Sequence, residues 1–516
     1  NSIPFSLPYA ETHYKFKLPW SPLSRPWPEI FLDGPSFCIP ERSPTFYLVL
    51  KDADYFPVKV REIEVVLQTM DGRIRKQTLP LDLRCEENLS FLPLAIDFAG
   101  LSGDVALTGK ITVENRKGRR RTILNANFPG IAPSPLRVRL LSSPLPYPEG
   151  WFAGEMHCHS DYSNDPVEFG APLEVLQQAG ASLGMGFVLC TDHSYDFYYR
   201  KTRYMERTDP DANFQAYRAK ALRLNECMSE DSGLPVVIPG EEVSCGNHRG
   251  ENVHLLVAGH PDFLPGLGDG GRRWLNNQPD LTIGEVLEHL GDTPRFAAHP
   301  RARIGALEKF IFRRGMWHAG DLQPGGQGAT VGGLQFWNGH RGRDFREGRE
   351  FWVQQLLAGH RLLPIGANDA HGDLNRNIGV KTPLFSLYQS RNHVFGHVRT
   401  VVQAERKTLA GIQEGLRRGR VLATDGPFLT LSQSEGSQGK VRLSARGTVD
   451  FGGMEKVSLF AGKRNGSGEA LAGEWSMEGG SLEWSGSADI PAGCLYLRAE
   501  GRTTAKRFAL TSPLFP

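Results

Sequence analysis

The sequence GEMHCHSDYSNDPVEFGAPLEVLQQAGASLGMGFVLCTDH, residues 154–193, holds the pattern that decides the fold of the chain. It begins with a strand-like run that ends at His157 and His159, passes through an amphipathic stretch, and returns to an apolar run that ends at His193. Pro172 stands at a good first-turn position for a helix in the amphipathic stretch. A strand, a helix and a second strand in this order predict a β–α–β unit within a parallel sheet.

The same alternation continues to about residue 385. Helix-like stretches begin near Ala171, Asn213, Thr282 and Phe345. The strand-like runs are GEMHCH (154–159), GFVLCTDH (186–193), PVVIPGEE (235–242), NVHLLVAG (252–259), RFAAHP (295–300), GLQFWNG (333–339) and LPIGAND (363–369). Seven strands are enough to close a barrel, so residues 151–385 are expected to form a (β/α)7 barrel domain.

The regions on both sides of this domain read mainly as β-structure. Residues 1–150 hold short alternating segments joined by turns such as Asp71-Gly72, which predict a β-sandwich-like domain. Residues 386–422 are expected to be a helical connection, because TLAGIQEGLRRG from Thr408 reads as a helix that stops at Gly419. Residues 423–516 return to short alternating segments and predict a second β-sandwich-like domain. We therefore expect a multidomain chain that is α/β in the middle and all-β at both ends.

The composition argues against several classes of protein. The chain has 59 Lys and Arg against 57 Asp and Glu, and so small a net charge disfavours bulk binding to nucleic acid or anionic membranes. The basic run RKGRRR from Arg116 lies between two strand-like segments and is expected to be a solvated hairpin turn. No stretch of about 18 apolar residues and no intact signal peptide is visible. Seven scattered cysteines without a CxxC pair indicate reduced thiols. These features favour a cytoplasmic protein with no nucleic-acid or membrane partner, although the chain begins at Asn1 and a removed leader stays open.

Polar residues gather where the predicted strands end. The ends of parallel strands meet at one face of a barrel, so these side chains are expected to converge there. Because side chains alternate along a strand, His157 and His159 point the same way while Cys158 points to the opposite layer. Imidazole and carboxylate ligands without thiolate suit Zn, Mn or Fe. The candidates at or near the strand ends are His157, His159, Asp192, His193, Glu241, Glu242, His254, His299, Asp369 and His371. So many ligands exceed the needs of one tetrahedral ion and predict two or three divalent metals that share a bridging carboxylate.

These motifs together resemble the PHP (polymerase and histidinol phosphatase) superfamily of amidohydrolase-like barrels, and in particular its CehA/McbA branch. The resemblance covers about residues 150–385, and ATDGPFLTL from Ala423 is similar to the start of the C-terminal β-region of that branch. The motifs that carry it are HCHSDYSNDPVEFG (157–170), LCTDHS (189–194), PGEEVS (239–244), NVHLLVAG (252–259), AAHP (297–300) and GANDAHG (366–372). The resemblance implies a distorted seven-stranded barrel with a trinuclear metal centre.

The resemblance also implies a division of the ligands among three metals. The first would be held by His157, His159 and Asp369, the second by His254 and His299 with Glu242 as the bridging carboxylate, and the third by His193, His371 and Asp165. The family often reads Ser-Asp-Gly where this chain has Ser163-Asn164-Asp165. Asp165 is preferred to Asn164 because a carboxylate binds a hard or borderline cation better. Glu241 and Glu242 point to opposite faces, and the Gly-x-Glu pattern of the family selects Glu242.

Such a centre predicts hydrolysis by a metal-bridging hydroxide. Asp369 and His193 are the expected catalytic residues: Asp369 would orient or deprotonate the attacking water, and His193 would stabilise the leaving oxygen. Arginines near the strand ends favour a phosphoester over a neutral substrate, because a guanidinium binds phosphate with two hydrogen bonds. The main prediction is therefore a phosphoesterase for a small phosphorylated molecule, and the predicted substrate-binding residues are Arg301, Arg303, Asn338 and Arg376.

Two alternatives stay open. The CehA/McbA branch is named for members that hydrolyse a carbamate ester, so a carbamate, ester or amide hydrolase is the second candidate, and aromatic residues such as Tyr195, Trp317 and Trp337 would suit its apolar leaving group. The third is a non-catalytic metal-binding scaffold whose terminal β-domains bind partners. A proofreading role beside a DNA polymerase is disfavoured, because no polymerase region follows and the net charge is only +2. The sequence does not fix the oligomeric state.

Overall fold

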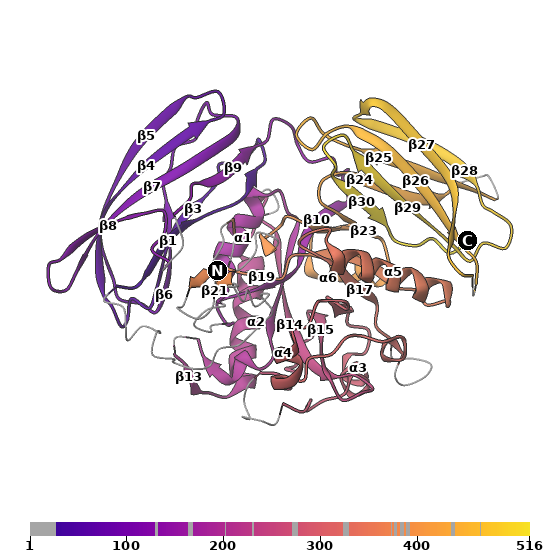
Figure 1. Cartoon of the computed structure of the whole chain (residues 1–516), viewed down its shortest axis with the longest axis horizontal. Helices are drawn as coiled ribbons and strands as arrows, with labels where there is room; N and C mark the ends of the chain where they lie inside the picture. The colour runs from indigo at the N-terminus through magenta and orange to yellow at the C-terminus, as the bar shows by residue number, and fades with distance from the viewer. Residues whose placement is uncertain are drawn as a thin grey trace, which may run out of the picture.

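A computed structural model of the chain describes residues 27–516 except 129–132, 164–168, 202, 230–231, 271–276, 324–329, 373, 376–378, 382–385, 389–392, 435–438 and 465. Two of the predicted site residues, Asp165 and Arg376, lie outside the described residues. Two β-rich regions flank a central region of mixed helices and strands (Figure 1). The described chain is therefore strand-rich, with α/β and β regions.

The N-terminal region consists of two packed sheets. One has the order β1-β3-β6 and the other β2-β9-β7-β4-β5, with β8 paired to β7. The strands are β1 (Glu29–Asp33), β2 (Phe37–Cys38), β3 (Phe46–Lys51), β4 (Val58–Thr69), β5 (Ile74–Cys85), β6 (Leu89–Leu94), β7 (Gly103–Asn115), β8 (Arg120–Leu124) and β9 (Leu136–Leu140). Alternate residues such as Ile63 and Ile111 fill the core between the sheets. The basic run from Arg116 forms the exposed β7–β8 turn, as predicted, with Gly118 at a positive φ of 71°.

The central region is built on seven strands that neighbour one another in chain order. They are β10 (Trp151–His159), β11 (Phe187–His193), β14 (Val236–Gly246), β15 (Asn252–Ala258), β16 (Arg295–Ala298), β17 (Gly333–Asn338) and β18 (Leu363–Ala367). The short β19 (Ala370–His371) follows β18 and pairs with β10, so the last strand returns to the first. This arrangement brings the first and the last polar motifs of the sequence side by side.

One of these strands runs against the predicted direction. The sequence predicted parallel strands throughout, but β15 is antiparallel to both β14 and β16. Only residues 247–251 connect β14 to β15, and so short a connection allows a hairpin but not a crossover. Because β15 is reversed, its beginning lies beside the carboxyl end of β14, with His254 opposite Ser244. The reversal therefore places His254 at the edge where the other predicted ligands lie.

The predicted helices form and cover the outside of these strands. They are α1 (Leu173–Ser182), α2 (Pro210–Glu226), α3 (Ile283–Leu290) and α5 (Arg343–Leu357), with the shorter α4 (Ala306–Ile311), η2 (Asp196–Tyr198) and η4 (Ala319–Leu322) between them. A pair of small strands, β12 (Tyr199–Arg200) and β13 (Arg203–Arg207), precedes α2. The start of α3 is fixed by a capping box, in which the Thr282 hydroxyl accepts from the Glu285 N–H and the Glu285 carboxylate accepts from the Thr282 N–H.

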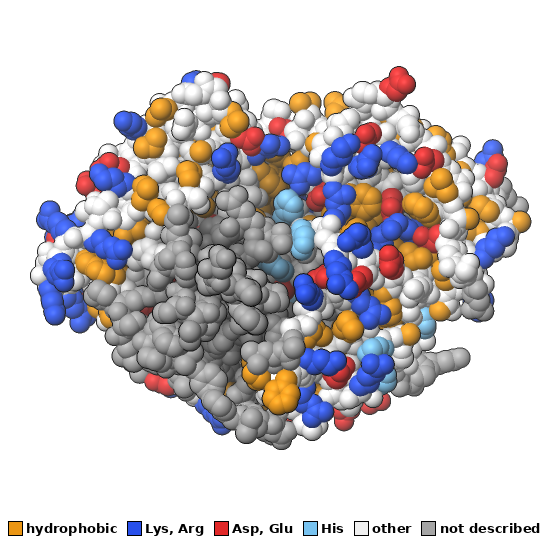
Figure 2. All heavy atoms as spheres, in the orientation of Figure 1, with side chains coloured by type: hydrophobic (Ala, Val, Ile, Leu, Met, Phe, Trp, Pro, Cys, Tyr) orange, Lys and Arg blue, Asp and Glu red, His pale blue; other side chains and the backbone are white. Residues whose placement is uncertain are grey.

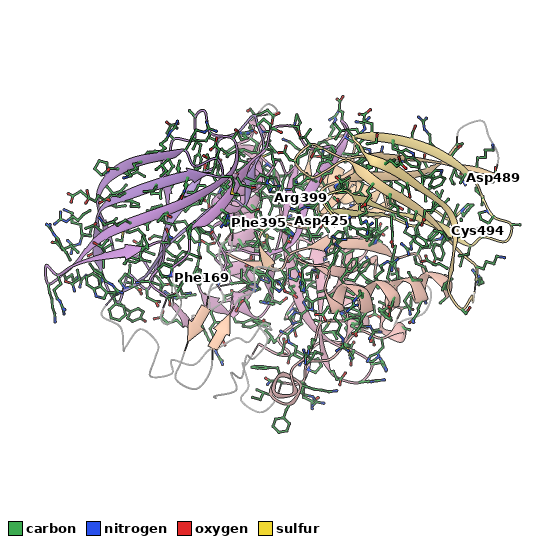
Figure 3. All side chains as sticks on the ribbon, turned by 45° about the horizontal axis from the view of Figure 1, so that its top comes forward. Phe169, Phe395, Arg399, Asp425, Asp489 and Cys494 are labelled. Atoms are coloured by element: carbon green, nitrogen blue, oxygen red, sulfur yellow. The ribbon has the colours of Figure 1, made fainter. Side chains whose placement is uncertain are left out.

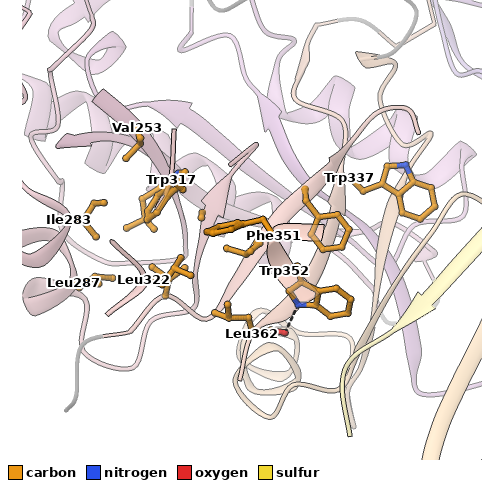
Figure 4. Packing of buried hydrophobic residues seen from close by; sticks show 14 of the residues in the cluster. Val253, Ile283, Leu287, Trp317, Leu322, Trp337, Phe351, Trp352 and Leu362 are labelled. Atoms are coloured by element: carbon orange, nitrogen blue, oxygen red, sulfur yellow. Dashed lines mark hydrogen bonds between the residues drawn. The ribbon is translucent and has the colours of Figure 1, made fainter. Parts of the chain in front are cut away.

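The apolar residues of the strands divide between an inner and an outer cluster. Leu189, Ile238, Leu256, Phe296 and Ile365 come from five strands and form one cluster. Their neighbours along the strands pack against the helices instead. Figure 4 shows part of this outer packing, where Trp337, Phe351 and Trp352 lie together and the Trp352 Nε1–H donates to the Leu362 carbonyl at 2.9 Å. The seven strands are therefore buried on both faces, which explains their nearly continuous apolar sequences.

A further helix, α6 (Leu409–Arg417), packs at the end of the strands opposite the polar motifs. Its Ile412 and Leu416 join the inner apolar cluster. Its Gln413 donates to the Ala258 carbonyl at the end of the reversed β15. Gly419 follows α6 with φ 70° and ends it, as predicted. The helix therefore closes the apolar end of the strand arrangement and leaves the other end to the polar residues.

The C-terminal region continues the central sheet without a break. Strand β22 (Arg399–Gln403) pairs antiparallel with β10, and the order continues through β23, β30, β29, β26 and β27. A second sheet of order β24-β25-β28 packs on it. The strands are β23 (Val421–Thr424), β24 (Phe428–Gln433), β25 (Lys440–Arg446), β26 (Met454–Gly462), β27 (Glu469–Ser481), β28 (Glu483–Asp489), β29 (Tyr496–Thr503) and β30 (Phe508–Thr511).

The predicted helical connection over residues 386–422 therefore contains a strand of the main sheet as well as α6. It begins with β21 (Ser386–Tyr388), which pairs with β20 (Gly379–Lys381) just before it. All seven cysteines fall within the described residues and remain free thiols, as predicted. Among the helices of the described chain, none combines the length and the apolar character that crossing a membrane requires.

Candidate metal centre

Eight of the nine predicted metal ligands come together at the polar end of the seven strands. They form three overlapping groups in which the ligand atoms lie within 4.8 Å of one another. The groups are His157, His159, Glu242 and Asp369; His193, Glu242 and His254; and His159, His193 and His371. The eighth residue, His299, places its Nε2 3.1 Å from Glu242 Oε1. The ninth, Asp165, lies outside the described residues.

The Glu242 carboxylate stands at the middle of this cluster. Its Oε2 lies 2.9 Å from His157 Nε2 and 3.3 Å from His159 Nε2, and His193 Nδ1 is also 3.3 Å away. Its Oε1 faces other imidazoles, with His254 Nδ1 at 2.5 Å and His299 Nε2 at 3.1 Å. Each oxygen therefore serves a different set of ring nitrogens, which is the arrangement required of a carboxylate that bridges two cations.

The neighbouring Glu241 points the other way. Its carboxylate accepts from the Ser194 hydroxyl at 2.9 Å and from the Leu264 N–H at 3.2 Å. Burial raises the pKa of Glu241 well above its usual value. Burial acts in the same direction on Glu242, but the imidazoles of His157, His254 and His193 outweigh it and hold the pKa of Glu242 well below its usual value. Two adjacent carboxyl groups thus have opposite electrostatic environments, and the sequence expectation that only Glu242 faces the cluster agrees with this placement.

The tautomer of His157 is set by a residue that the sequence reading missed. The Gln335 side-chain oxygen accepts from the His299 N–H at 3.0 Å, and this fixes the orientation of the amide. His157 Nδ1 lies 3.2 Å from the same oxygen and must donate to it. In the neutral ring, Nε2 then carries a lone pair directed at Glu242 and at the Nε2 of His159, 3.3 Å away. Lone pairs that face one another in a dry site call for a cation between them, so the donor set fits a metal.

Asp269 is a second residue that the sequence reading missed. Its Oδ2 lies 3.1 Å from His254 Nε2, and its Oδ1 accepts from the Ser244 hydroxyl at 2.6 Å. Arg314 Nε pairs with the same carboxylate at 2.5 Å. Burial opposes ionisation of Asp269, but Arg314 and His254 outweigh burial and lower its pKa. Asp269 therefore orients His254 by its outer nitrogen and leaves Nδ1 to Glu242.

Two residues of the cluster lie in strained backbone. Asp369 has φ 55° and His299 has φ 27°, in the left-handed region that residues other than glycine seldom adopt. The Asp369 N–H donates to the His157 carbonyl at 2.8 Å, which holds the turn in place. Glycine would relieve this strain but would remove the side chains. Such strain at two of the eight assembled residues is typical of functional sites.

The buried Glu155 carboxylate links the strand of His157 to the turn of Asp369 through hydrogen bonds. Glu155 accepts from the backbone N–H groups of His157, Asn368 and Gly396 at 3.0–3.2 Å, and also from the Asn368 side chain. Asn368 in turn accepts from the Val398 N–H at 2.9 Å. The strand that carries His157 is thereby tied to the turn that carries Asp369.

Other candidates near the cluster are occupied elsewhere. Asp192 accepts from the N–H groups of Ser160 and Ser163 and from the Ser160 hydroxyl, so it shapes the loop after β10. Cys158 points to the opposite layer, as predicted, and its sulfur lies 3.9 Å from that of Cys190. Tyr195 stacks on His193 with ring centroids 4.6 Å apart.

The predicted substrate-binding residues are only partly assembled. Asn338 is at the cluster, with its Nδ2 3.4 Å from Asp369 Oδ2. Arg301 instead stacks on the Phe351 ring of α5 at 4.0 Å, while Arg303 is exposed in the same loop. The His299 side chain is 11% exposed, whereas the rings of His157, His159, His193 and His254 are fully buried. The approach to the cluster is therefore most open beside His299. Arg376 lies outside the described residues.

Comparison with known proteins adds no family. No family model matches the sequence, and no curated protein matches it. Among solved structures, the β-glucuronidase of Parabacteroides merdae gives a TM-score of 0.18 at 10% identity, over 93% of this chain and 64% of that one. A protein assigned as a β-galactosidase from Bacteroides fragilis gives 0.17 at 11% identity, over 95% and 73%. The chain thus spans less than two thirds of the glucuronidase, and TM-scores this low carry no inference about fold or activity.

Proposed function

We propose that this chain is a metal-dependent hydrolase of the PHP type, with its centre at Glu242. The proposal includes the finer fold prediction, a distorted (β/α)7 barrel. Support for the barrel comes from the chain-order pairing of the seven strands and from the return of β19 to β10. Support for the centre comes from one observation above all. A single buried carboxylate uses its two oxygens to face five imidazoles from four different segments of the chain.

The predicted ligands would be divided among the metals in the way that the family resemblance implies. Two or three divalent cations, Zn, Mn or Fe, would be held by the eight assembled residues, with Asp165 as a further candidate. When bound, such cations lower the pKa of water and polarise the oxygen of an ester or amide. The protein must then exclude bulk water and keep the ligands in place. Gln335 and Asp269 do the second by fixing the outer nitrogens of His157 and His254.

Two side chains are suited to handle protons. The Asp369 carboxylate is oriented by the Asn338 amide, so one oxygen can accept the proton of an attacking water while the other is held. The His193 ring is kept in place by stacking on Tyr195 and can stabilise or protonate the leaving oxygen. Asp369 and His193 are therefore the proposed catalytic residues.

The proposed substrate is a small phosphoester, and its candidate binding residues are Asn338, which contacts Asp369, and the exposed Arg303, which lies in the loop after His299. One observation favours the second candidate. The stacking of Arg301 on Phe351 withdraws one of the guanidinium groups from which the phosphoester prediction was made. A carbamate, ester or amide would need fewer cationic contacts and remains the alternative substrate class.

The test begins with metal content and turnover on one preparation. The protein is purified without chelator, bound Zn, Mn and Fe are measured per chain, and p-nitrophenyl phosphate, bis-p-nitrophenyl phosphate and 1-naphthyl methylcarbamate are offered. We expect two or three metals per chain and phosphoester hydrolysis. Hydrolysis of the carbamate alone would move the proposal to the second substrate class. Metal that cannot be restored by added Mn or Zn, together with no turnover, would favour the non-catalytic scaffold.

The catalytic role of Asp369 is tested separately. Asp369→Asn keeps the size of the side chain and its contact with Asn338 but removes the proton acceptor. We expect turnover to fall by about 10²-fold or more, in the range typical of general base catalysis. Full activity in this variant would contradict the assignment. Asp192→Asn serves as the control, because that carboxylate binds loop N–H groups outside the three ligand groups.

A further inference from the structure

A second polar site lies away from the metal centre, where three parts of the chain meet. It is a cavity of about 200 Å³ between strand β9, the start of β22 and the C-terminal sheets. The residues that matter for its chemistry are Arg137, Arg139, His397, Arg399, Asp425 and Arg507. None of the eight assembled metal-centre residues is among those that line this interdomain cavity. Figure 3 shows Arg399 and Asp425 in the middle of the molecule, between the N-terminal and the C-terminal strands.

Contacts between the N-terminal and C-terminal regions hold the walls of the interdomain cavity together. Asp450 accepts from the backbone and hydroxyl groups of Ser142 and Ser143 at 2.9–3.2 Å. The Phe37 and Phe451 rings meet edge to face at 5.8 Å. These contacts hold the N-terminal and C-terminal regions together around the cavity.

Positive charge exceeds negative charge in the lining. Four arginines face two carboxylates, Asp104 and Asp425. Both carboxylate oxygens of Asp104 accept a hydrogen bond from Arg139, each at 2.8 Å. Asp425 accepts from the Phe508 N–H at 2.5 Å and lies 3.8 Å from Arg341, outside the lining. Arg137 and Arg507 lie near enough for their charges to lower the pKa values of Asp104 and Asp425, respectively. Within 4 Å, however, no ion pair joins Arg137, Arg399 or Arg507 to a carboxylate of the described chain, so the arginines outnumber the carboxylates that could neutralise them. Histidine side chains near the middle of the molecular face, with Lys and Arg beside them, are visible in Figure 2.

Arg399 makes this excess unusual. Its side chain is only 3% exposed, and a cation so deeply buried is normally paired. Its Nε donates to the Gly396 carbonyl at 2.9 Å, and its guanidinium lies 4.6 Å from the centre of the Phe37 ring. Arg399 also forms a hydrogen bond with the Tyr147 side chain, and the charge of the buried Glu155 acts on it. None of these contacts is an ion pair with a carboxylate. Burial lowers the pKa of Arg399, and Tyr147 and Glu155 only partly oppose this effect.

The excess of positive charge in the cavity also affects His397. Burial and the positive charges of Arg507, Arg399 and Arg341 lower its pKa to about 4, and His340 adds to the effect. The ring is therefore neutral near pH 7 and faces the arginines without adding charge. It can donate one hydrogen bond to an occupant of the cavity and gains a second donor when protonated.

We propose that the interdomain cavity binds a small oxyanion, carried by a phosphate or a carboxylate group, between Arg399, Arg507 and His397. The cavity is smaller than the roughly 300–1,000 Å³ pockets that hold drug-sized ligands, so the occupant is a small molecule. Arginine forks match both phosphate and carboxylate geometry, and the excess of unpaired guanidinium groups excludes a cation. The proposal does not depend on the hydrolase activity, because no metal-centre residue lines the cavity.

The test follows the His397 ring by NMR in histidine-labelled full-length protein, with the signal assigned by its loss in His397→Gln. Inorganic phosphate and succinate are titrated separately at two pH values. A bound oxyanion neutralises the arginines, so we expect the pKa of His397 to rise from about 4 toward its usual value. The anion that acts at the lower concentration identifies the group as phosphate or carboxylate.

The variant Arg507→Ala removes one guanidinium at the half-buried side of the cavity and should weaken anion binding about tenfold or more, the loss expected for a charge-assisted contact. Arg502→Ala is the matched control, because that exposed arginine pairs with Glu455 on the neighbouring strand outside the cavity. It should bind the anion as the wild type does. Equal binding by Arg507→Ala and the wild type would overturn the proposal, and so would a His397 signal that moves only above about 100 mM anion. Phosphate bound at the metal centre would inhibit hydrolysis equally in all three proteins and leave the His397 signal unchanged.

Discussion

Glu242 is the residue on which the proposed metal centre depends, because its two oxygens face different imidazoles. Its neighbour Glu241 has the same side chain and is equally buried, yet within the described part of the chain its carboxylate accepts hydrogen bonds from Ser194 and the Leu264 N–H and from no histidine. The pair provides a built-in comparison of a carboxylate inside the cluster with one just outside it.

Replacing Glu242 by Gln should remove most of the bound metal. An amide keeps the shape but supplies one weaker oxygen and an N–H₂ group that repels a cation, so we expect metal content to fall by more than about half and turnover to be lost. Elemental analysis and the hydrolase assay measure both. Glu241→Gln should keep its metal. Similar losses in the two variants would indicate general damage to β14 instead of a bridging ligand.

His397 should make stability fall with acid. The pKa of His397 is about 4 in the folded state, against 6.5 for the free side chain. Between pH 4 and pH 6.5 the ring is therefore protonated in the unfolded chain and neutral in the folded chain. Stability is therefore lost as the pH falls below about 6.5, by about 2 kcal/mol between pH 7 and pH 5. Thermal unfolding of the wild type and of His397→Gln at several pH values measures the difference. The variant should lose less over this window, and parallel curves would contradict the prediction.

Most of the residues of the centre could be predicted from sequence, but the residues that orient them could not. The ligands are chemically distinctive and occur at strand ends, as His157 and His371 do. Gln335 looks like any polar residue in an apolar strand, and Asp269 lies in a Gly-rich loop 27 residues after Glu242. Their importance depends on contacts between distant segments. The one available signal was Glu155, a charged residue that alternates with His157 and His159 in a buried strand.

At the scale of elements, the start of α3 depends on its capping box. Thr282→Ala should remove the hydroxyl that accepts from the Glu285 N–H and should destabilise the protein by about 1 kcal/mol. The helix is short, and its buried Val286 and Leu287 belong to the outer apolar cluster, so the loss is expected to lower the temperature of the first unfolding transition in calorimetry. Thr282→Ser keeps the hydroxyl and should stay close to the wild type. An equal loss in both variants would assign the effect to the threonine methyl group instead of the cap.

The sequence predicted helices and strands well where the periodic hydrophobic pattern extends over many residues. It predicted them less well where pairing with distant strands determines the direction or the presence of a strand. The periods at Asn213 and Phe345 gave α2 and α5, with starts displaced by two or three residues. The direction of β15 was missed because an apolar run reads the same in either direction. Strand β22 was missed because RTVVQ is five residues long beside a clearer helix, and its pairing with β10 is a contact across about 250 residues.

At the scale of the whole molecule, a buried ion network fastens the central region to the C-terminal sheet. Arg498 on β29 is fully buried and donates to Glu469 at 2.5 and 2.7 Å, and it also pairs with Glu500. Arg349 on α5 reaches the same Glu500 at 2.5 Å. The network therefore joins a helix of the central region to two C-terminal strands.

Arg498→Met should destabilise the protein by about 3–5 kcal/mol, because the two glutamates are left buried without their shared partner. Arg502→Met on the same strand removes only an exposed pair with Glu455 and should cost less than about 1 kcal/mol. Chemical denaturation at fixed metal concentration compares the two. Equal shifts would show that the burial of Arg498 contributes nothing to the cost.

The unbroken run of strands from β18 to β27 has a consequence for how such a protein can change over evolutionary time. Strand β22 joins β10, which carries His157 and His159, to β23 and the rest of the C-terminal sheet. A gene fusion or deletion that removed the C-terminal strands would leave a bare edge beside the strand that carries these histidines, open to self-association. The C-terminal strands cannot then be exchanged as an independent module. Any homologue that keeps the histidine pair on this frame is expected to keep strands equivalent to β22 and β23, whatever its substrate.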